Sequence, residues 1–96
     1  MIKVFKMING EEIIAKAEVC ELGYKISDPA AIVIQQTEKG VGVGLAPYMP
    51  YANSEITLYF TGIASEGTPN VNMENEYNRI FGSGIQIASA GSIQTA

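Results

Sequence analysis

The sequence predicts a mostly β domain, a small and strongly bent barrel of about five strands with one amphipathic helix. Short runs of alternating apolar and polar residues, separated by turn signals, recur over residues 2–63, and a later segment carries apolar residues at helical spacing. The chain has 96 residues, 47% of them hydrophobic, which is enough for one packed core and too little for two domains. We therefore expect a single domain over residues 1–88 and a flexible tail over residues 89–96.

The first two strands are predicted to form a hairpin. Residues 2–8 alternate with the period of a strand, and the pair Asn9-Gly10 follows at once. This pair is favoured in two-residue hairpin turns, which need positive φ at both central positions. Residues 13–20 then alternate again. Residues 11–18 are rich in good helix formers, so a helix is the alternative, but the preceding turn favours a strand.

The middle of the chain reads as two further strands. Gly23 predicts a bend or bulge, after which the strand continues to a turn at Asp28-Pro29. Residues 30–37 are apolar and β-branched at their centre, which predicts the most buried strand. In residues 41–45 every second position is glycine, which favours sharp bending and close approach by another backbone.

Residues 47–53 predict an exposed loop, because two prolines prevent regular strand pairing and stiffen the backbone that carries Tyr48 and Tyr51. Residues 55–63 alternate most clearly of all and predict a strand with Phe60 facing inward, ending at Gly62.

The helix is predicted from an apolar stripe at i, i+4, i+7 and i+8, formed by Met73, Tyr77, Ile80 and Phe81. Asn70 or Asn72 is suited to the N-cap, and Gly82 to the position after the last turn. A short closing strand is possible over residues 85–87.

Charge and composition exclude most enzyme classes. The chain has 6 Lys and Arg against 10 Asp and Glu, a net charge of −4, and no His. The absence of His removes the commonest general base near neutral pH and all His-containing catalytic or metal sites. Cys20 is the single cysteine, so no intrachain disulfide or paired-cysteine zinc site can form. We expect no catalytic residues, metal or cofactor, and any nucleic-acid contact must be local.

The composition also predicts self-association. Charged residues make up 17% of the chain, below the ~25% that is usual, and mean hydropathy is +0.13. A small barrel leaves strand edges whose unpaired backbone groups can pair with another copy. We expect such pairing to build a homo-oligomeric ring.

The order of these motifs resembles the Sm-like (LSm and Hfq) family. A short strand ends at Gly10, a long bent strand follows, and an Asp-containing turn, Ser27-Asp28-Pro29-Ala30-Ala31, leads into an apolar strand. Residues 58–63, Leu-Tyr-Phe-Thr-Gly-Ile, look like the family's second motif, in which an apolar residue, a basic residue and a glycine end the fourth strand. The resemblance covers residues 4–67, and the chain looks most like the small marine phage-type members.

The resemblance implies a ring of about five to seven subunits that binds single-stranded RNA or DNA and serves in nucleic-acid processing. The expected partners are thus other copies of the chain and single-stranded nucleic acid. No run approaches the ~18 apolar residues of a membrane-spanning helix, and residues 1–12 lack the long apolar stretch of a signal peptide. We expect no membrane partner and a cytoplasmic location, in the host cell if the chain is phage-encoded.

The sequence departs from the family at its binding positions. The family's Asp is followed three residues on by an Asn that hydrogen-bonds a base, with a stacking residue between them, whereas Ala31 and Ala30 stand here. Thr61 replaces the basic residue before Gly62. The segment between Gly10 and Asp28 is longer than usual, and the helix follows the fourth strand instead of preceding the first.

Six residues are candidate nucleic-acid contacts: Lys25, Asp28, Tyr48, Tyr51, Thr61 and Gly62. Lys25 would repeat around a ring as a circle of positive charge. Asp28 could shape a base-binding loop or merely cap its own turn. The two tyrosines could stack on unpaired bases or contact a protein.

Two functions therefore remain open. The first is a ring without enzymatic activity that binds single-stranded nucleic acid. The second is a structural or adaptor ring whose partner is another protein, favoured by the acidic charge, the missing Asn and basic residue, and the loop of tyrosines and prolines.

Overall fold

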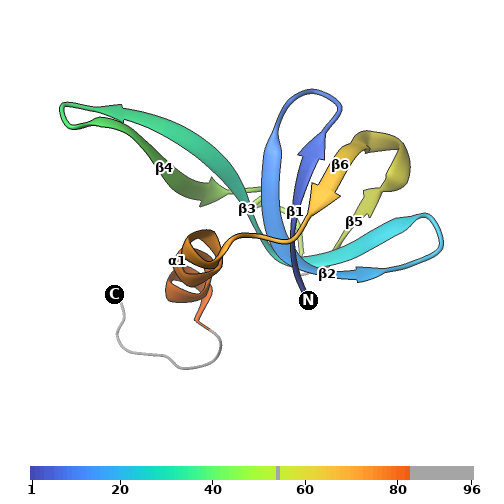
Figure 1. Cartoon of the computed structure of the whole chain (residues 1–96). Coiled ribbons are helices and arrows are strands. Elements are labelled where there is room, and N and C mark those ends of the chain that lie inside the picture. The colour runs from blue at the N-terminus through green and yellow to red at the C-terminus, as the bar shows by residue number, and fades with distance from the viewer. Residues whose placement is uncertain (54, 83–96) are drawn as a thin grey trace.

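The computed structural model describes residues 1–53 and 55–82, which form a six-stranded antiparallel sheet and one α-helix (Figure 1). The strands are β1 (Ile2–Met7), β2 (Glu12–Val19), β3 (Gly23–Thr37), β4 (Gly40–Pro47), β5 (Ile56–Tyr59) and β6 (Ile63–Gly67). The helices are the short 3-10 helix η1 (Phe60–Gly62) and α1 (Val71–Phe81). The strand order is β4-β3-β2-β1-β6, and β5 also pairs with β3.

The mostly β class with one helix is confirmed. Within residues 1–53 and 55–82 the hydrogen-bonded sheet does not close on itself, because β6 pairs only with β1 and β5 pairs only with β3. The observed architecture is thus a curved antiparallel sheet with open edges.

The β1–β2 hairpin has a three-residue turn, so the predicted two-residue turn is wrong in length. The Met7 N–H donates to the Glu11 carbonyl at 2.8 Å, and the Gly10 N–H donates to the Met7 carbonyl at 2.9 Å. Gly10 has φ of 94°, a value that favours glycine in the bulge that ends such a turn. The Asn9 side chain accepts from the Glu11 N–H at 2.9 Å and stabilises the turn further.

The segment after the hairpin is a strand, as predicted, and the alternative helix is excluded. A turn then separates β2 from β3, so Gly23 begins a new strand instead of bending the second one. Glycine is required there by close packing, because a Cβ atom on Gly23 would lie 1.9 Å from the Leu58 carbonyl oxygen of β5.

Asp28-Pro29 is a β-bulge inside β3, so the predicted turn at this position is wrong. Ile14 pairs with Ala30 and Lys16 pairs with Ser27, which leaves Asp28 and Pro29 opposite one residue of β2. Asp28 adopts φ of 49°, in the left-handed region that Asp tolerates better than most residues. The chain stays in the sheet because β2 pairs with β3 on both sides of the bulge.

The outer part of the β3–β4 hairpin, residues 33–44, extends away from the other strands (Figure 1), and we call it the arm. The prediction that residues 30–37 form the most buried strand is wrong, since Ile34 is 73% exposed. The deepest strand is β2, where Ile13, Ile14 and Ala15 are fully buried.

No other backbone of residues 1–53 and 55–82 approaches Gly42 or Gly44 of β4 closely. A Cβ atom on Gly42 would find its nearest neighbour at 3.9 Å, and one on Gly44 would meet only the Gln35 side chain, at 3.1 Å. The expected close crossing of backbones at this strand is therefore absent from the described part of the chain.

The predicted strand over residues 55–63 is two strands joined by η1. β5 ends at Tyr59, the chain turns through η1, and β6 runs back along β1. Phe60 is 45% exposed, so the prediction that it faces inward is wrong. Its ring still lies against Tyr24, with centroids 5.7 Å apart.

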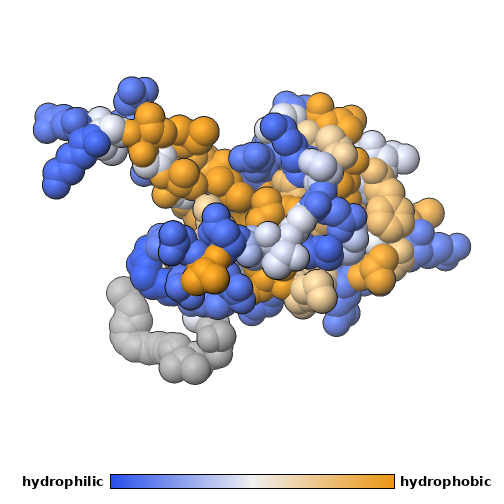
Figure 2. Space-filling model, viewed as in Figure 1, coloured by the Kyte–Doolittle hydropathy of each residue, from blue (hydrophilic) through white to orange (hydrophobic). Residues whose placement is uncertain are grey.

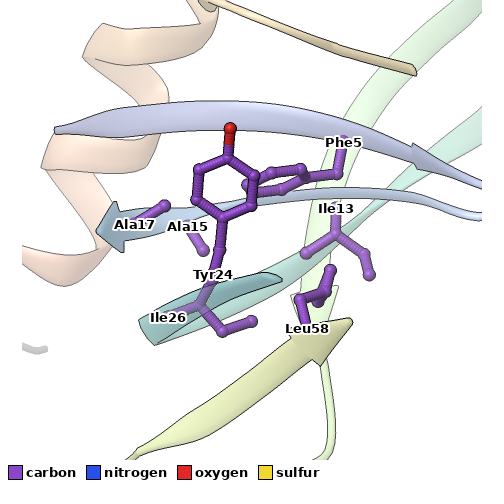
Figure 3. Packing of buried hydrophobic residues seen from close by; sticks show 7 residues of the cluster. All are labelled: Phe5, Ile13, Ala15, Ala17, Tyr24, Ile26 and Leu58. Atoms are coloured by element: carbon purple, nitrogen blue, oxygen red, sulfur yellow. The ribbon is translucent and has the colours of Figure 1, made fainter. Parts of the chain in front are cut away.

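The core has two parts, on opposite faces of β1 and β2. The first cluster, drawn in Figure 3, comprises Phe5, Ile13, Ala15, Ala17, Tyr24, Ile26 and Leu58. The second cluster comprises Ile14, Ala30 and Tyr77, with Ile2, Val4, Ile32, Leu45, Met73 and Phe81 packed around it. Both faces of these strands are covered because the sheet curls over one face and α1 covers the other (Figure 1).

Helix α1 has the predicted caps. Asn70 is the N-cap, and its side chain accepts from the Met73 N–H at 2.8 Å, while the Gly82 N–H donates to the Asn78 carbonyl. Tyr77 is fully buried against the sheet. The strand predicted over 85–87 and the tail predicted over 89–96 lie outside the described residues.

Candidate functional site

A groove of about 460 Å³ lies between the Asp28-Pro29 bulge, the loop after β4 and the last turn of α1. Its walls are mostly apolar and include Pro29, Tyr48, Met49, Ile80 and Phe81. This volume lies within the range of ligand-binding clefts. Two predicted site residues, Asp28 and Tyr48, meet here.

Asp28 holds the bulge in place through both its backbone and its side chain. Its carbonyl oxygen accepts a hydrogen bond from the Tyr77 hydroxyl at 2.6 Å. Its carboxylate pairs with Lys16 Nζ at 3.1 Å. Burial, with a smaller contribution from the charge of Asp28, raises the pKa of Tyr77 to about 12.

The two candidate tyrosines occupy different environments. Tyr48 is half-buried and packs against the first cluster, contrary to its predicted display on an exposed loop. Burial raises its pKa, and the negative charge of Glu11 raises it further. Tyr51 is 99% exposed, as predicted, so of these two tyrosines Tyr51 is the one whose ring is fully open to stacking by a partner.

Most positive charges are neutralised by carboxylates. Lys25 Nζ lies 3.5 Å from Glu55, and Lys25 also pairs across the sheet with Glu18 of β2. The ion pairs among the described residues join Lys3 to Glu66, Lys16 to Asp28, Lys25 to Glu55 and Arg79 to Glu76. Four of the six cations of the chain are thus paired. The surface therefore has little unbalanced positive charge to attract phosphate groups.

Thr61 and Gly62 lie in η1, away from Asp28. The Phe60 N–H donates to the Leu22 carbonyl at 2.9 Å, which places η1 at the start of β3. Asp28 lies five residues beyond Gly23, a separation of about 17 Å at the rise of a strand. The six candidate residues are thus distributed over at least three places, with Lys25 beside Glu55, and do not form one site.

A polar cluster that the sequence analysis missed joins β1, β3 and β6. The Tyr24 hydroxyl donates to the Glu66 carboxylate, and Lys3 Nζ lies 3.0 Å from Glu66 and 5.7 Å from the Tyr24 ring centroid. The hydrogen bonds from Tyr24 and Lys3 lower the pKa of Glu66, and the hydrogen bond to Glu66 raises the pKa of Tyr24 and of Lys3. No sequence signal pointed to it, because β6 was not predicted.

No protein-family model matches the chain, and no curated protein matches it. Among residues 1–53 and 55–82, no three His, Cys, Asp or Glu side chains are grouped so that they could hold a metal ion. No helix in this part of the chain has the length and hydropathy needed to cross a bilayer.

Proposed function

We propose that this chain is a Sm-like structural or adaptor protein that assembles into a homo-oligomeric ring and acts by binding a protein partner. The observation that carries the proposal is the set of open strand edges, formed by β4 and β5 on one side of the sheet and by β6 on the other.

The strand arrangement supports a bent Sm-like barrel. The strands β6, β1, β2, β3 and β5 follow one another in the pairing. The two at the ends of this series are consecutive in the chain and are joined only by the three residues of η1. A connection this short keeps the ends of the curved sheet close together, as a small barrel requires.

The edges of β4 and β6 differ from each other, which favours a ring over a symmetric dimer. β4, Gly-Val-Gly-Val-Gly-Leu-Ala-Pro, contains no charged residue, whereas edge strands that avoid association carry charges, especially Lys. The edge of β6 lies at the other end of the sheet. Pairing of one kind of edge with the other is head-to-tail, and such contacts build closed rings when the rotation between subunits closes.

The charges favour a protein partner over nucleic acid. The net charge is −4 and four of the six cations are ion-paired. The groove beside Tyr48 and Met49 is apolar, and the neighbouring loop presents Tyr51 on a backbone stiffened by Pro50. Tyrosine and methionine are enriched at protein interfaces.

Binding of single-stranded nucleic acid is the second candidate. The observation that favours it is the complete exposure of Tyr51, because an aromatic ring can stack on any base. Lys6 and Lys39, which have no carboxylate partner within residues 1–53 and 55–82, would supply the phosphate contacts.

Light scattering on the purified chain over a series of concentrations tests the ring. We expect a mass that is a fixed multiple of the 10.3 kDa chain. Ala64→Lys, which places a charge on the exposed edge strand β6, should reduce the mass. A monomer at every concentration would overturn the ring.

Fluorescence anisotropy with short RNA and DNA oligonucleotides at low salt separates the two kinds of partner. We expect no binding. Binding that is lost both in Tyr51→Ala and at high salt would replace the adaptor proposal with the nucleic-acid one.

A further inference from the structure

The arm carries its apolar side chains on one face. Residues directly opposite each other in an antiparallel pair point to the same side of the sheet. The pairs on the apolar face are Ile32 with Leu45, Ile34 with Val43, and Gln36 with Val41. The pairs on the other face are Val33 with Gly44, Gln35 with Gly42, and Thr37 with Gly40. The second face thus has little apolar surface beyond one valine.

The apolar face of the arm continues the second core cluster. At the base of the arm, Ile32 and Leu45 pack against the cluster that α1 covers. Farther out the same face is uncovered, and Ile34, Val41 and Val43 are 73%, 68% and 55% exposed. Figure 2 shows hydrophobic side chains gathered along the arm between its hydrophilic tip and the body of the molecule.

A two-stranded ribbon with an exposed apolar face is stabilised when another surface packs on that face. An isolated hairpin is marginally stable in water, and strands become stable when a third strand or a packed face supports them. The pairing nevertheless continues without a break to Thr37 and Gly40 at the tip. Burial of this face against another surface would therefore stabilise the arm.

We propose that the apolar face of the arm packs onto a second copy of this chain, which rests on the self-association proposed above and assigns part of its interface. The distribution of charge favours a second copy as the occupant of this face. Each copy carries −4, so repulsion between two copies is smallest when they meet where charges are absent. Residues 30–37 and 40–47 form the longest paired stretch of the sheet, and neither contains a charged residue. A nucleic acid would instead require cations, and the arm offers only Lys39.

A groove beside the arm extends the surface available to the second copy. It has a volume of about 440 Å³ and lies between the arm, the end of β6 and the start of α1. Val4, Ile32, Val43 and Met73 contribute its apolar walls, and the charged residues Lys6, Glu12 and Glu66 line it as well. A copy seated on Ile34 and Val43 could thus fill this groove with the same contact.

The test compares variants on the two faces of the arm. Ile34→Thr with Val43→Thr removes apolar surface from one cross-strand pair while keeping residues that favour strands. Gln35→Thr, on the other face, is the matched control. By light scattering and sedimentation, we expect the double variant to need at least about tenfold more protein for half-assembly than wild type. The control should assemble as wild type does.

Hydrogen exchange on the wild-type protein gives a second readout that needs no variant. Amides of residues 33–43 should become more protected as protein concentration rises from dilute to assembled samples. A double variant that folds and assembles like wild type, or arm amides whose protection ignores concentration, would overturn the arm interface. If Ala64→Lys dissociates the assembly and the double variant in the arm does not, the proposed pairing of strand edges is kept and the arm interface is rejected. A wild-type protein that is monomeric would overturn both proposals.

Discussion

The hydroxyl of Tyr77 donates a hydrogen bond to the backbone carbonyl of Asp28 across 2.6 Å. This contact joins the only α-helix of the described chain to the bulge in β3, 49 residues earlier. The ring of Tyr77 is fully buried and forms part of the second cluster with Ile14 and Ala30. Tyr77 thus holds the helix to the sheet with a polar end as well as an apolar ring, beside the apolar contacts of Met73 and Phe81.

Removal of this hydroxyl should destabilise the protein modestly. Tyr77→Phe leaves the Asp28 carbonyl without its donor, and we expect a loss of about 1–2 kcal/mol in the free energy of unfolding. Tyr77→Ala also empties the space filled by the ring and should cost about 3–5 kcal/mol. Urea unfolding followed by circular dichroism measures both. Tyr51→Phe, at a fully exposed tyrosine, is the control and should leave stability unchanged.

Gly23 should tolerate no side chain, whereas Gly42 should accept one. Gly23→Ala places a Cβ atom 1.9 Å from the Leu58 carbonyl oxygen, and both groups are backbone, so β3 and β5 must separate. We expect a loss of about 3 kcal/mol or more. Gly42→Ala has its nearest neighbour at 3.9 Å, and should raise stability by up to about 1 kcal/mol. Equal unfolding midpoints for the two variants would contradict the close approach of β5.

Acid should destabilise the protein partly through Glu66. The pKa of this carboxyl is lowered in the folded state by its hydrogen bonds from Tyr24 and Lys3. Its contribution is therefore present above the ordinary pKa of 4.5 and is lost as the pH falls through the lower folded value. In Glu66→Gln we expect a shallower loss of stability below pH 4.5 than in wild type. Parallel pH profiles from thermal unfolding would show that the cluster contributes nothing.

Asp28 should matter for its backbone more than for its charge. Its ion pair with Lys16 is exposed, and exposed pairs are worth about 0–1 kcal/mol. Asn tolerates the left-handed conformation, so Asp28→Asn should cost no more than this. Asp28→Val places a β-branched residue at φ of 49° and should cost about 1–3 kcal/mol. Denaturant unfolding of the two variants decides between them, and a larger loss in Asp28→Asn would make the charge the dominant factor.

The candidate site could be predicted only in part. The exposure of Tyr51 follows from a loop rich in prolines, which is local information. The separation of Asp28 from Thr61 and Gly62 does not follow from local sequence, because it depends on where β3 pairs with β5. The pairing of Lys25 with Glu55 likewise comes from elements distant in sequence.

The sequence by itself determined the features that depend on neighbouring residues. The strand class, the turn at Gly10, and the helix with its Asn70 cap and buried Tyr77 all follow from side-chain periodicity and backbone preferences within a few positions.

Only the tertiary structure decided which side chains are buried and where a strand continues past a turn-like sequence. Residues 30–37 look like a core strand, yet Ile34 is exposed because β3 runs past the last element that covers it. Asp28-Pro29 looks like a turn, yet pairing with β2 on both sides keeps it in the sheet. Burial and strand pairing depend on contacts with segments that are distant in the chain. The local sequence pattern does not predict which distant segment will pack against a given strand.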